Sequence, residues 1–173
     1  MVVERLARSC LVSSSFGALL AASPVGAAVP AQVSIGFRFA CAVGTGGGVE
    51  CWGANDFGKL GDGTTEYRLD PVPVVGLASG VASVDGGENH ACAVTTGGGV
   101  KCWGRNADGE LGDGTTTGSA TPVDVSGLAS GVAAVSASRD LCNLGVSRPS
   151  TCALTTSGGV KCWGNKVVGA FDS

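Results

Sequence analysis

Residues 40–53 read A-C-A-V-G-T-G-G-G-V-E-C-W-G, and this phrase returns twice further along the chain. It recurs at residues 91–104 as A-C-A-V-T-T-G-G-G-V-K-C-W-G and at residues 151–164 as T-C-A-L-T-T-S-G-G-V-K-C-W-G. The first two copies are 51 residues apart, and the last two are 60 residues apart. A period of about 50 residues, built from short apolar runs and glycine turns, indicates a repeat architecture. Such an architecture favours a scaffold over a catalyst.

Composition favours strands over helices. Aromatic residues make up 5% of the chain and charged residues 14%, while 30 glycines supply turns between runs of valine, alanine and threonine. After residue 30 no run keeps the i, i+3, i+4, i+7 spacing of an amphipathic helix. We therefore expect an all-β protein. The net charge is −3 and the 11 basic residues form no cluster, so a nucleic-acid surface is not supported.

The first 27 residues differ from the rest of the chain. Arg5 and Arg8 precede a mostly apolar run from Cys10 to Ala22, and small residues follow Pro24. This order is typical of a secretory signal peptide, so we predict that residues 1–27 are a signal peptide and residues 28–173 the folded part. The alternative is a disordered N-terminal tail. We expect no transmembrane helix, because no stretch reaches the roughly 20 apolar residues that a bilayer crossing needs.

Six of the eight cysteines form three C-x9-C pairs: Cys41 with Cys51, Cys92 with Cys102, and Cys152 with Cys162. Zinc sites favour shorter spacings. In a hairpin with an odd-numbered loop centred on Gly97, Cys92 faces Cys102 at a Cα separation of about 4.5 to 5.5 Å, which suits a disulfide. A two-residue turn at Gly97-Gly98 would instead place Cys92 opposite Trp103. The odd loop pairs like residues in all three copies, so we predict three disulfides. The alternative is six buried thiols in a reducing compartment.

Two cysteines remain outside these pairs. Cys10 would leave with the signal peptide. Cys142 lies in residues 138–150, the segment that holds the extra residues of the third copy. An unpaired cysteine in an exported chain is a candidate for an intermolecular bridge.

The segments between the hairpins also repeat. Residues 55–65 and 106–116 share the pattern N-x-x-G-x-L-G-D-G-T-T. A P-V-x-V run follows at residues 71–74 and 122–125, and a V-A-x-V run at residues 81–84 and 132–135. With the two hairpin strands, each repeat offers four short strands, which is the content of one β-propeller blade. We predict a partial β-propeller of four-stranded antiparallel blades, with two complete repeats plus partial ones.

The pattern C-W-G-x-N-x-x-G-x-L-G-D-G-T-T, followed by P-V-x-V and H-A-C-A-V, resembles the regulator of chromosome condensation repeat family. The cysteine pairs make it most similar to the bacterial branch, and the resemblance covers about residues 32–165. It implies a seven-bladed propeller that binds proteins through loops on one face. The founding member is an exchange factor for a small nuclear GTPase and binds chromatin. Other members are a plant ultraviolet-B photoreceptor and bacterial inhibitors of β-lactamases.

The set of repeats is incomplete. Seven repeats of this period need roughly 350 residues, and the last one breaks off after Cys162-Trp163-Gly164-Asn165 without an L-G-D-G-T run. We expect that this chain alone does not close a ring. It is a fragment of a longer product, a degenerate paralogue, or a subunit that closes by association, and the interrupted motif favours the fragment. Open blade edges would promote self-association.

The sequence offers no constellation of residues for chemistry. His90 is the only histidine, which excludes a histidine-based metal cluster, and Phe39 takes its place in the first copy, which favours packing or turn bonding over catalysis. Residues 106–110 resemble a calcium loop, but Gly104 and Thr115 stand where acidic ligands are needed. The glycine triplets lack the lysine of a phosphate-binding loop. We predict no catalytic residue, no metal and no cofactor.

Two sets of repeated residues are assigned structural roles. Asp62 and Asp113 lie in G-D-G-T, where a carboxylate can accept hydrogen bonds from backbone N–H groups and fix a tight turn. The tryptophans of the C-W-G runs are predicted to fill space between blades: Trp52, Trp103 and Trp163. The alternative is that they anchor a ligand.

These observations predict an exported scaffold, secreted or in the cell envelope, that binds another protein without catalysis. Loops such as residues 66–70 and 117–121 would form the binding face. One alternative is an exchange-factor-like regulator of a small GTPase, which the cysteine pairs and the leader disfavour. The other is a propeller that acts like the β-lactamase inhibitors of the family. The identity of the partner does not follow from loops this short and polar.

Overall fold

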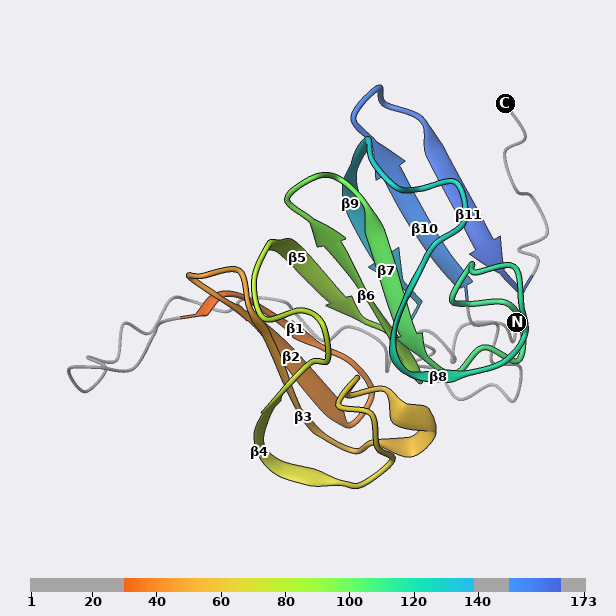
Figure 1. The fold of residues 1–173 in the computed structure, drawn as a ribbon. Coiled ribbons are helices and arrows are strands. Elements are labelled where there is room, and N and C mark those ends of the chain that lie inside the picture. Colours follow the sequence, from red (N-terminus) through yellow and green to blue (C-terminus); the bar gives the residue numbers. More distant parts are fainter. Residues whose placement is uncertain (1–29, 139–149, 166–173) are drawn as a thin grey trace, which may run out of the picture.

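The fold is known from a computed structural model that describes residues 30–138 and 150–165 (Figure 1). The predicted signal peptide and both unpaired cysteines, Cys10 and Cys142, lie outside the described residues. Within the described part the regular elements are strands, apart from a 3-10 helix, η1, at Asp56–Gly58.

The strands form three antiparallel sheets in chain order. The first has the order β1 (Pro30–Ile35), β2 (Phe39–Gly44), β3 (Val49–Gly53), β4 (Arg68–Pro73). The second has the order β5 (Val81–Gly86), β6 (His90–Thr95), β7 (Val100–Gly104), β8 (Ser119–Asp124). The third has β9 (Val132–Ala137), β10 (Ser150–Thr155) and β11 (Val160–Gly164), with β10 in the middle. The prediction of four-stranded antiparallel blades, two of them complete, is confirmed.

The outer strands begin earlier than expected. The sequence predicted strands at the P-V-x-V runs, residues 71–74 and 122–125, but β4 begins at Arg68 and β8 at Ser119, so Pro71 and Pro122 lie inside these strands. Both strands are the last of their sheets. A proline is tolerated there because one side of an edge strand has no ladder bond to lose.

The cysteine hairpins have the odd-loop register in all three copies. Cys41 lies opposite Cys51, Cys92 opposite Cys102, and Cys152 opposite Cys162, with the valines or leucine two positions on also paired. Each pair forms a disulfide across a Cα separation of 4.1 Å. The bridges join the two middle strands of the first two sheets and the strands β10 and β11 of the third.

Alternation along the strands gives each sheet two different faces. We call the side that carries the disulfide the cysteine face, and the opposite side, which carries the C-W-G tryptophan, the tryptophan face. The sheets stand side by side (Figure 1), and the cysteine face of one packs on the tryptophan face of the next. The core between the first two sheets includes Cys41, Val43, Val49, Cys51, Val84, Ala91, Ala93 and Trp103. The core between the second and third contains Cys92, Val94, Val100, Cys102, Val132, Ala153 and Trp163.

The glycine triplets of the hairpins permit this close stacking. The Val81 N–H donates to the Gly47 carbonyl at 3.0 Å, and the Val132 N–H donates to the Gly98 carbonyl at 3.0 Å. A Cβ on Gly48 would lie 2.7 Å from the Ala78 carbonyl oxygen, and one on Gly99 would lie 2.8 Å from that of Ala129. Only glycine lets the tip of one hairpin approach the segment that enters the next sheet.

Candidate functional site

The tryptophans hold neighbouring sheets together by hydrogen bonds as well as by packing. Trp103 is fully buried, and its Nε1–H donates to the Lys59 carbonyl of the preceding repeat at 2.9 Å. Trp163 repeats this bond to the Glu110 carbonyl at 2.8 Å. Trp52 is half-buried, and no described sheet packs on its side. Trp103 and Trp163 each therefore fix the loop of the preceding repeat through the backbone of its K-L-G or E-L-G run.

Lys59 is buried at the first junction, with 1% of its side chain exposed. Its Nζ donates to the Phe37 carbonyl at 3.3 Å, lies 3.7 Å from the Asp56 carboxylate and sits 5.4 Å from the centre of the Phe39 ring. It also reaches the Asn89 side-chain oxygen at 3.5 Å. Burial lowers the pKa of Lys59, and the Asp56 carboxylate offsets only part of this.

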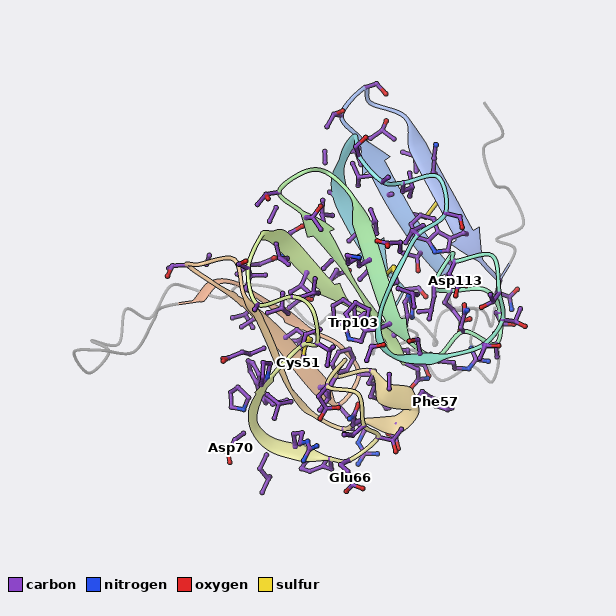
Figure 2. The ribbon with its side chains drawn as sticks, viewed as in Figure 1. Cys51, Phe57, Glu66, Asp70, Trp103 and Asp113 are labelled. Carbon is purple, nitrogen blue, oxygen red and sulfur yellow. A yellow bond between two sulfur atoms is a disulfide. The ribbon has the colours of Figure 1, made fainter. Side chains whose placement is uncertain are left out.

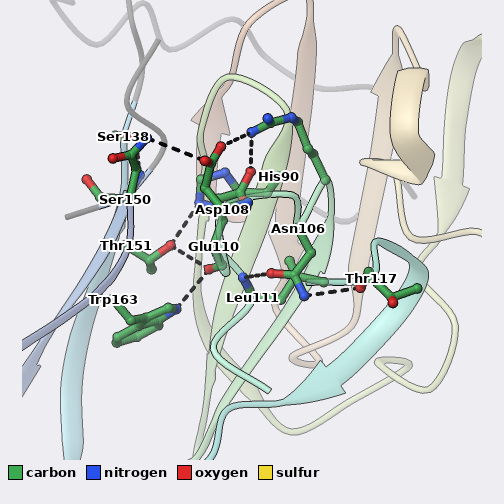
Figure 3. Close-up of polar contacts among 12 residues, drawn as sticks. His90, Asn106, Asp108, Glu110, Leu111, Thr117, Ser138, Ser150, Thr151 and Trp163 are labelled. Carbon is green, nitrogen blue, oxygen red and sulfur yellow. Dashed lines mark hydrogen bonds and ion pairs between the residues drawn. The ribbon is translucent and has the colours of Figure 1, made fainter. Parts of the chain in front are cut away.

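Glu110 takes the place of Lys59 at the second junction and is fully buried (Figure 3). Arg105 Nη1 donates to the Glu110 carboxylate at 2.5 Å and to Asp108 at 2.9 Å. The other Glu110 carboxylate oxygen accepts from the Asp108 backbone N–H at 2.7 Å. The buried anion thus has a cation and a backbone donor, which is the condition for burying a charge without a large loss of stability.

His90 completes the second junction. Thr151 Oγ1 donates to the Glu110 carbonyl at 2.9 Å, so it must accept from His90 Nε2 at 2.9 Å, and Nε2 carries the ring hydrogen. His90 Nδ1 is buried and has no hydrogen-bond partner among the described residues. Burial, with a smaller contribution from the Arg105 charge, lowers the pKa of His90 to about 4. This environment suits a neutral packing residue.

The G-D-G-T aspartates organise the loops. Asp62 accepts from the Thr64 N–H at 3.0 Å, from the Asn55 amide at 3.1 Å and from Arg68 Nε at 2.8 Å. Burial raises the pKa of Asp62, but the bonds from Thr64, Arg68 and Asn55 outweigh it, so the pKa lies below the ordinary value. The buried Asn55 also accepts from the Leu60 N–H at 2.9 Å and ties the turn to the core.

The second repeat has the same network without the arginine. Asp113 accepts from the Thr115 N–H at 2.9 Å and from the Asn106 amide at 3.2 Å. Ser119 stands where the first repeat has Arg68. Burial raises the pKa of Asp113, but the hydrogen bonds from Thr115 and Asn106 outweigh burial, so this pKa also lies below the ordinary value. The role that the sequence proposes for both aspartates is consistent with these contacts.

The three disulfides differ in exposure. Cys41, Cys51, Cys92 and Cys102 are fully buried under the following sheet. Cys152 is half-buried and Cys162 is exposed, because no described sheet follows the third.

The loops at the η1 end form a hollow between the first and second sheets. It has a volume of about 400 Å³ and is lined by residues that include Phe57, Thr65, Arg105, Ala107, Thr116 and Ala120. Phe57 is 55% exposed and has a φ of 66°, a backbone conformation that a bulky residue rarely adopts. Figure 2 shows Phe57, Glu66 and Asp70 along the outline of the first sheet, whereas Trp103 lies between sheets. Among the described residues no group of three or more His, Cys, Asp or Glu is placed to hold a metal. No helix in the same part of the chain could cross a bilayer.

The sequence did not single out Asn55, Asn106, Lys59 or Glu110. The asparagines could have been found, because both repeats carry them at the same position. The buried Lys59 and Glu110 could not, because lysine and glutamate are normally exposed.

Comparison with known proteins identifies the repeat. The family model described as "Regulator of chromosome condensation (RCC1) repeat" matches residues 47–94 and 98–142, and a second model of that description matches residues 81–110. The human E3 ubiquitin-protein ligase HERC2 is 38% identical over 98 residues, which cover 56% of this chain and 2% of HERC2. The Arabidopsis thaliana Ultraviolet-B receptor UVR8 is 40% identical over 75 residues, which cover 43% of this chain and 17% of the receptor.

A solved structure shares the fold. The crystal structure of yeast RCC1 (Prp20) bound to Kap60 superimposes with a TM-score of 0.65 and 22% identity, over 82% of this chain and 31% of that one. The chain therefore spans less than a third of each of these three proteins.

Proposed function

Because the chain belongs to the regulator of chromosome condensation (RCC1) repeat family, we propose that it is an exported, non-catalytic scaffold that binds another protein through the loops of its η1 end. The yeast relative in fold was crystallised with a protein partner, Kap60. The relatives differ in what their names say they do, so the repeat supplies a surface rather than one reaction.

A difference between the first two repeats carries the proposal. Phe57, Tyr67 and Leu69 are 55%, 61% and 80% exposed. The equivalent residues of the second repeat are Asp108, Gly118 and Ala120, so the fold does not need large apolar side chains there. Exposed aromatic residues that folding does not require are typical anchors of protein interfaces.

The charges around these residues suggest the chemistry of the partner. Asp56, Glu66 and Asp70 are exposed in the first repeat, and the second has Ala107, Thr117 and Thr121 in their places. Arg68, between Glu66 and Asp70, is paired with Asp62. Each exposed apolar residue thus has an exposed carboxylate next to it in the chain, which favours a partner whose surface combines basic and apolar groups.

The binding test exchanges the residues of one repeat for those of the other. A triple variant, Phe57→Asp, Tyr67→Gly and Leu69→Ala, carries the second repeat's side chains. The matched control is Val75→Ser, which makes the same kind of exchange at an exposed valine outside the loop. We expect a partner cross-linked to the wild-type chain to be lost with the triple variant and kept with the control. Equal capture by all three proteins would contradict the assignment of the site.

Two other functions can be measured directly on the same proteins. An exchange-factor-like chain would accelerate nucleotide release from a small GTPase, and an inhibitor-like chain would slow a β-lactamase. We expect neither activity.

The disulfides support an oxidising location, because bridges of this kind do not persist in reducing compartments. We propose that residues 1–27 are a signal peptide, that the mature chain begins near residue 28, and that it is secreted or held in the cell envelope. N-terminal sequencing of the exported product tests the cleavage, and reduction should add six hydrogens to its mass. Free thiols in the native protein would point to the cell interior instead.

A further inference from the structure

Two sheet faces remain uncovered in the described chain. On the tryptophan face of the first sheet, Val33 is 51% and Ile35 61% exposed. On the cysteine face of the third sheet, Leu154 is 44% and Val160 59% exposed. Their counterparts inside the stack are covered: Val84, the counterpart of Val33, is 1% exposed, and the pair Val94 and Val100 is 2% exposed.

We propose that these two faces bind each other between copies of the chain. The tryptophan face of one copy would pack on the cysteine face of a second copy, in the arrangement that joins consecutive sheets within the chain. The contact joins different surfaces, so it is head-to-tail, and further copies can add in the same direction.

The sizes of the facing residues support a second copy as the occupant. At the first junction Phe39 faces Gly86, where a Cβ would already lie 3.0 Å from the ring. At the second junction the smaller His90 lies beside Ala137: a Cβ on Gly87 would lie 2.9 Å from His90 Cε1 and 3.1 Å from Ala137 Cβ. At the open faces the corresponding residues are Ser150 and Ile35. As the residue on one side shrinks from Phe to His to Ser, the one on the other side grows from Gly to Ala to Ile.

The hydrogen bonds that join the first strands of neighbouring sheets, β1 to β5 and β5 to β9, can continue across the contact between copies. Ser34 Oγ accepts from the Gly86 N–H at 3.0 Å, and the Asp85 carboxylate accepts from the Ala137 N–H at 2.9 Å. The next position in this series is Ser136, whose exposed hydroxyl can accept from the Ile35 N–H of the second copy.

The tip of the third hairpin leaves room for a neighbour. Gly48 and Gly99 must be glycine because the following repeat approaches them. At Gly159 a Cβ would meet only Thr155 Oγ1 of its own hairpin, at 3.3 Å, so no described contact from a following sheet requires glycine there. Retention of glycine at this position keeps the approach open.

One bond of the internal junctions has no equivalent in this contact. Val81 and Val132 donate their N–H groups to the preceding hairpin tip. The residue at that position of the first sheet is Pro30, which has no N–H. The contact is therefore weaker than the stacking within the chain, and we expect it to depend on concentration.

Sedimentation of the purified, oxidised chain tests the proposal with three variants. Val33→Lys disables the tryptophan face, Val160→Lys disables the cysteine face, and Val75→Lys is the matched control at a valine outside both faces. We expect the average mass of the wild-type chain and of the control to rise to that of a dimer or more between about 10 and 500 μM, because a contact that lacks one of the internal bonds should be weak and transient. Each face variant alone should remain a monomer, with association weakened at least about tenfold.

Mixing the two face variants gives the sharpest result. Each keeps one intact face, and the intact faces are complementary, so an equimolar mixture should form a dimer and stop there. A wild-type chain that stays monomeric throughout the range would overturn the proposal. So would a Val33→Lys variant that still dimerises, because that would show two cysteine faces in contact. Equal melting temperatures for all variants confirm that loss of association is not loss of folding.

Discussion

The two junctions between sheets bury opposite charges at the same position. At the first, Lys59 lies among the Phe37 carbonyl, the Asp56 carboxylate and the Phe39 ring. At the second, Glu110 is held by Arg105 and by a backbone N–H. The backbone contact is the same at both junctions: the carbonyl oxygen of each residue accepts a hydrogen bond from a tryptophan Nε1–H.

This difference shows which part of the repeat the fold constrains. The main-chain bond to the next tryptophan is shared, whereas the sign of the buried charge is set by neighbours that changed with it. Ala54 stands where the second repeat has Arg105, and Phe39 stands where it has His90. A charge exchanged without its neighbours would be left unpaired in the core.

The largest expected effect comes from the residue that closes the first junction. Trp103→Ala should lower the free energy of unfolding by about 3 to 5 kcal/mol, because a fully buried tryptophan and its bond to Lys59 are lost. Trp163→Ala, at a half-buried position, should lower the free energy of unfolding by about half as much, and Trp52→Ala by about 1 kcal/mol or less. Urea titrations of the three oxidised variants give the order. Equal losses at all three positions would show that the tryptophans do not act between sheets.

Removing the cation of the second junction should come next. Arg105→Ala leaves Glu110 buried without a counter-charge and should cost about 3 kcal/mol. The double variant Arg105→Ala with Glu110→Gln should be more stable than Arg105→Ala alone, because the unpaired charge is gone. A double-mutant cycle by urea denaturation measures this coupling. Strictly additive losses would rule out the ion pair as the source of the effect.

The histidine at the second junction should make stability depend on pH. Its pKa is lowered to about 4 in the folded chain and returns to about 6.5 in the unfolded chain. Between these values the unfolded chain binds a proton that the folded chain does not, so the free energy of unfolding should fall by about 2 to 3 kcal/mol as the pH drops from 6.5 to 4. His90→Phe, which restores the residue of the first junction, should remove this slope. A slope that survives the substitution belongs to another group.

The smallest difference concerns the loop aspartates. Asp62→Asn should cost about 1 to 2 kcal/mol, because it weakens the bonds from Thr64 and the pair with Arg68. Asp113→Asn should cost about 1 kcal/mol or less, because Ser119 replaces that arginine. Thermal unfolding of the two variants at pH 7 provides the comparison. A larger loss at Asp113 would mean that the arginine contributes nothing.

Much of the fold could be predicted because the chain repeats its own pattern. Three copies of C-x9-C with like residues two positions inside each cysteine allow one register that pairs them all, and the structure has it. The buried charges could not be predicted in this way. Lys59 and Glu110 are interior because the next tryptophan covers their backbone, and such a long-range contact leaves no trace in local composition.

The candidate binding site lies where the repeats disagree. Phe57 and Asp108 occupy one position, and the sequence comparison alone does not say that the phenylalanine is exposed or that its φ is positive. Residues 66–70 and 117–121 were predicted to be loops of the binding face, but residues 68–70 belong to β4 and residues 119–121 to β8. The hollow next to Phe57 depends on how two sheets meet. That geometry is set by packing.

The hairpin tips have one position that faces away from the neighbouring sheets. A Cβ on Gly46 would meet nothing within 4 Å, and the third copy already carries an exposed serine, Ser157, there. A larger residue, or a side chain that carries a fluorophore, can therefore replace the glycine at this position while the stack behind remains undisturbed.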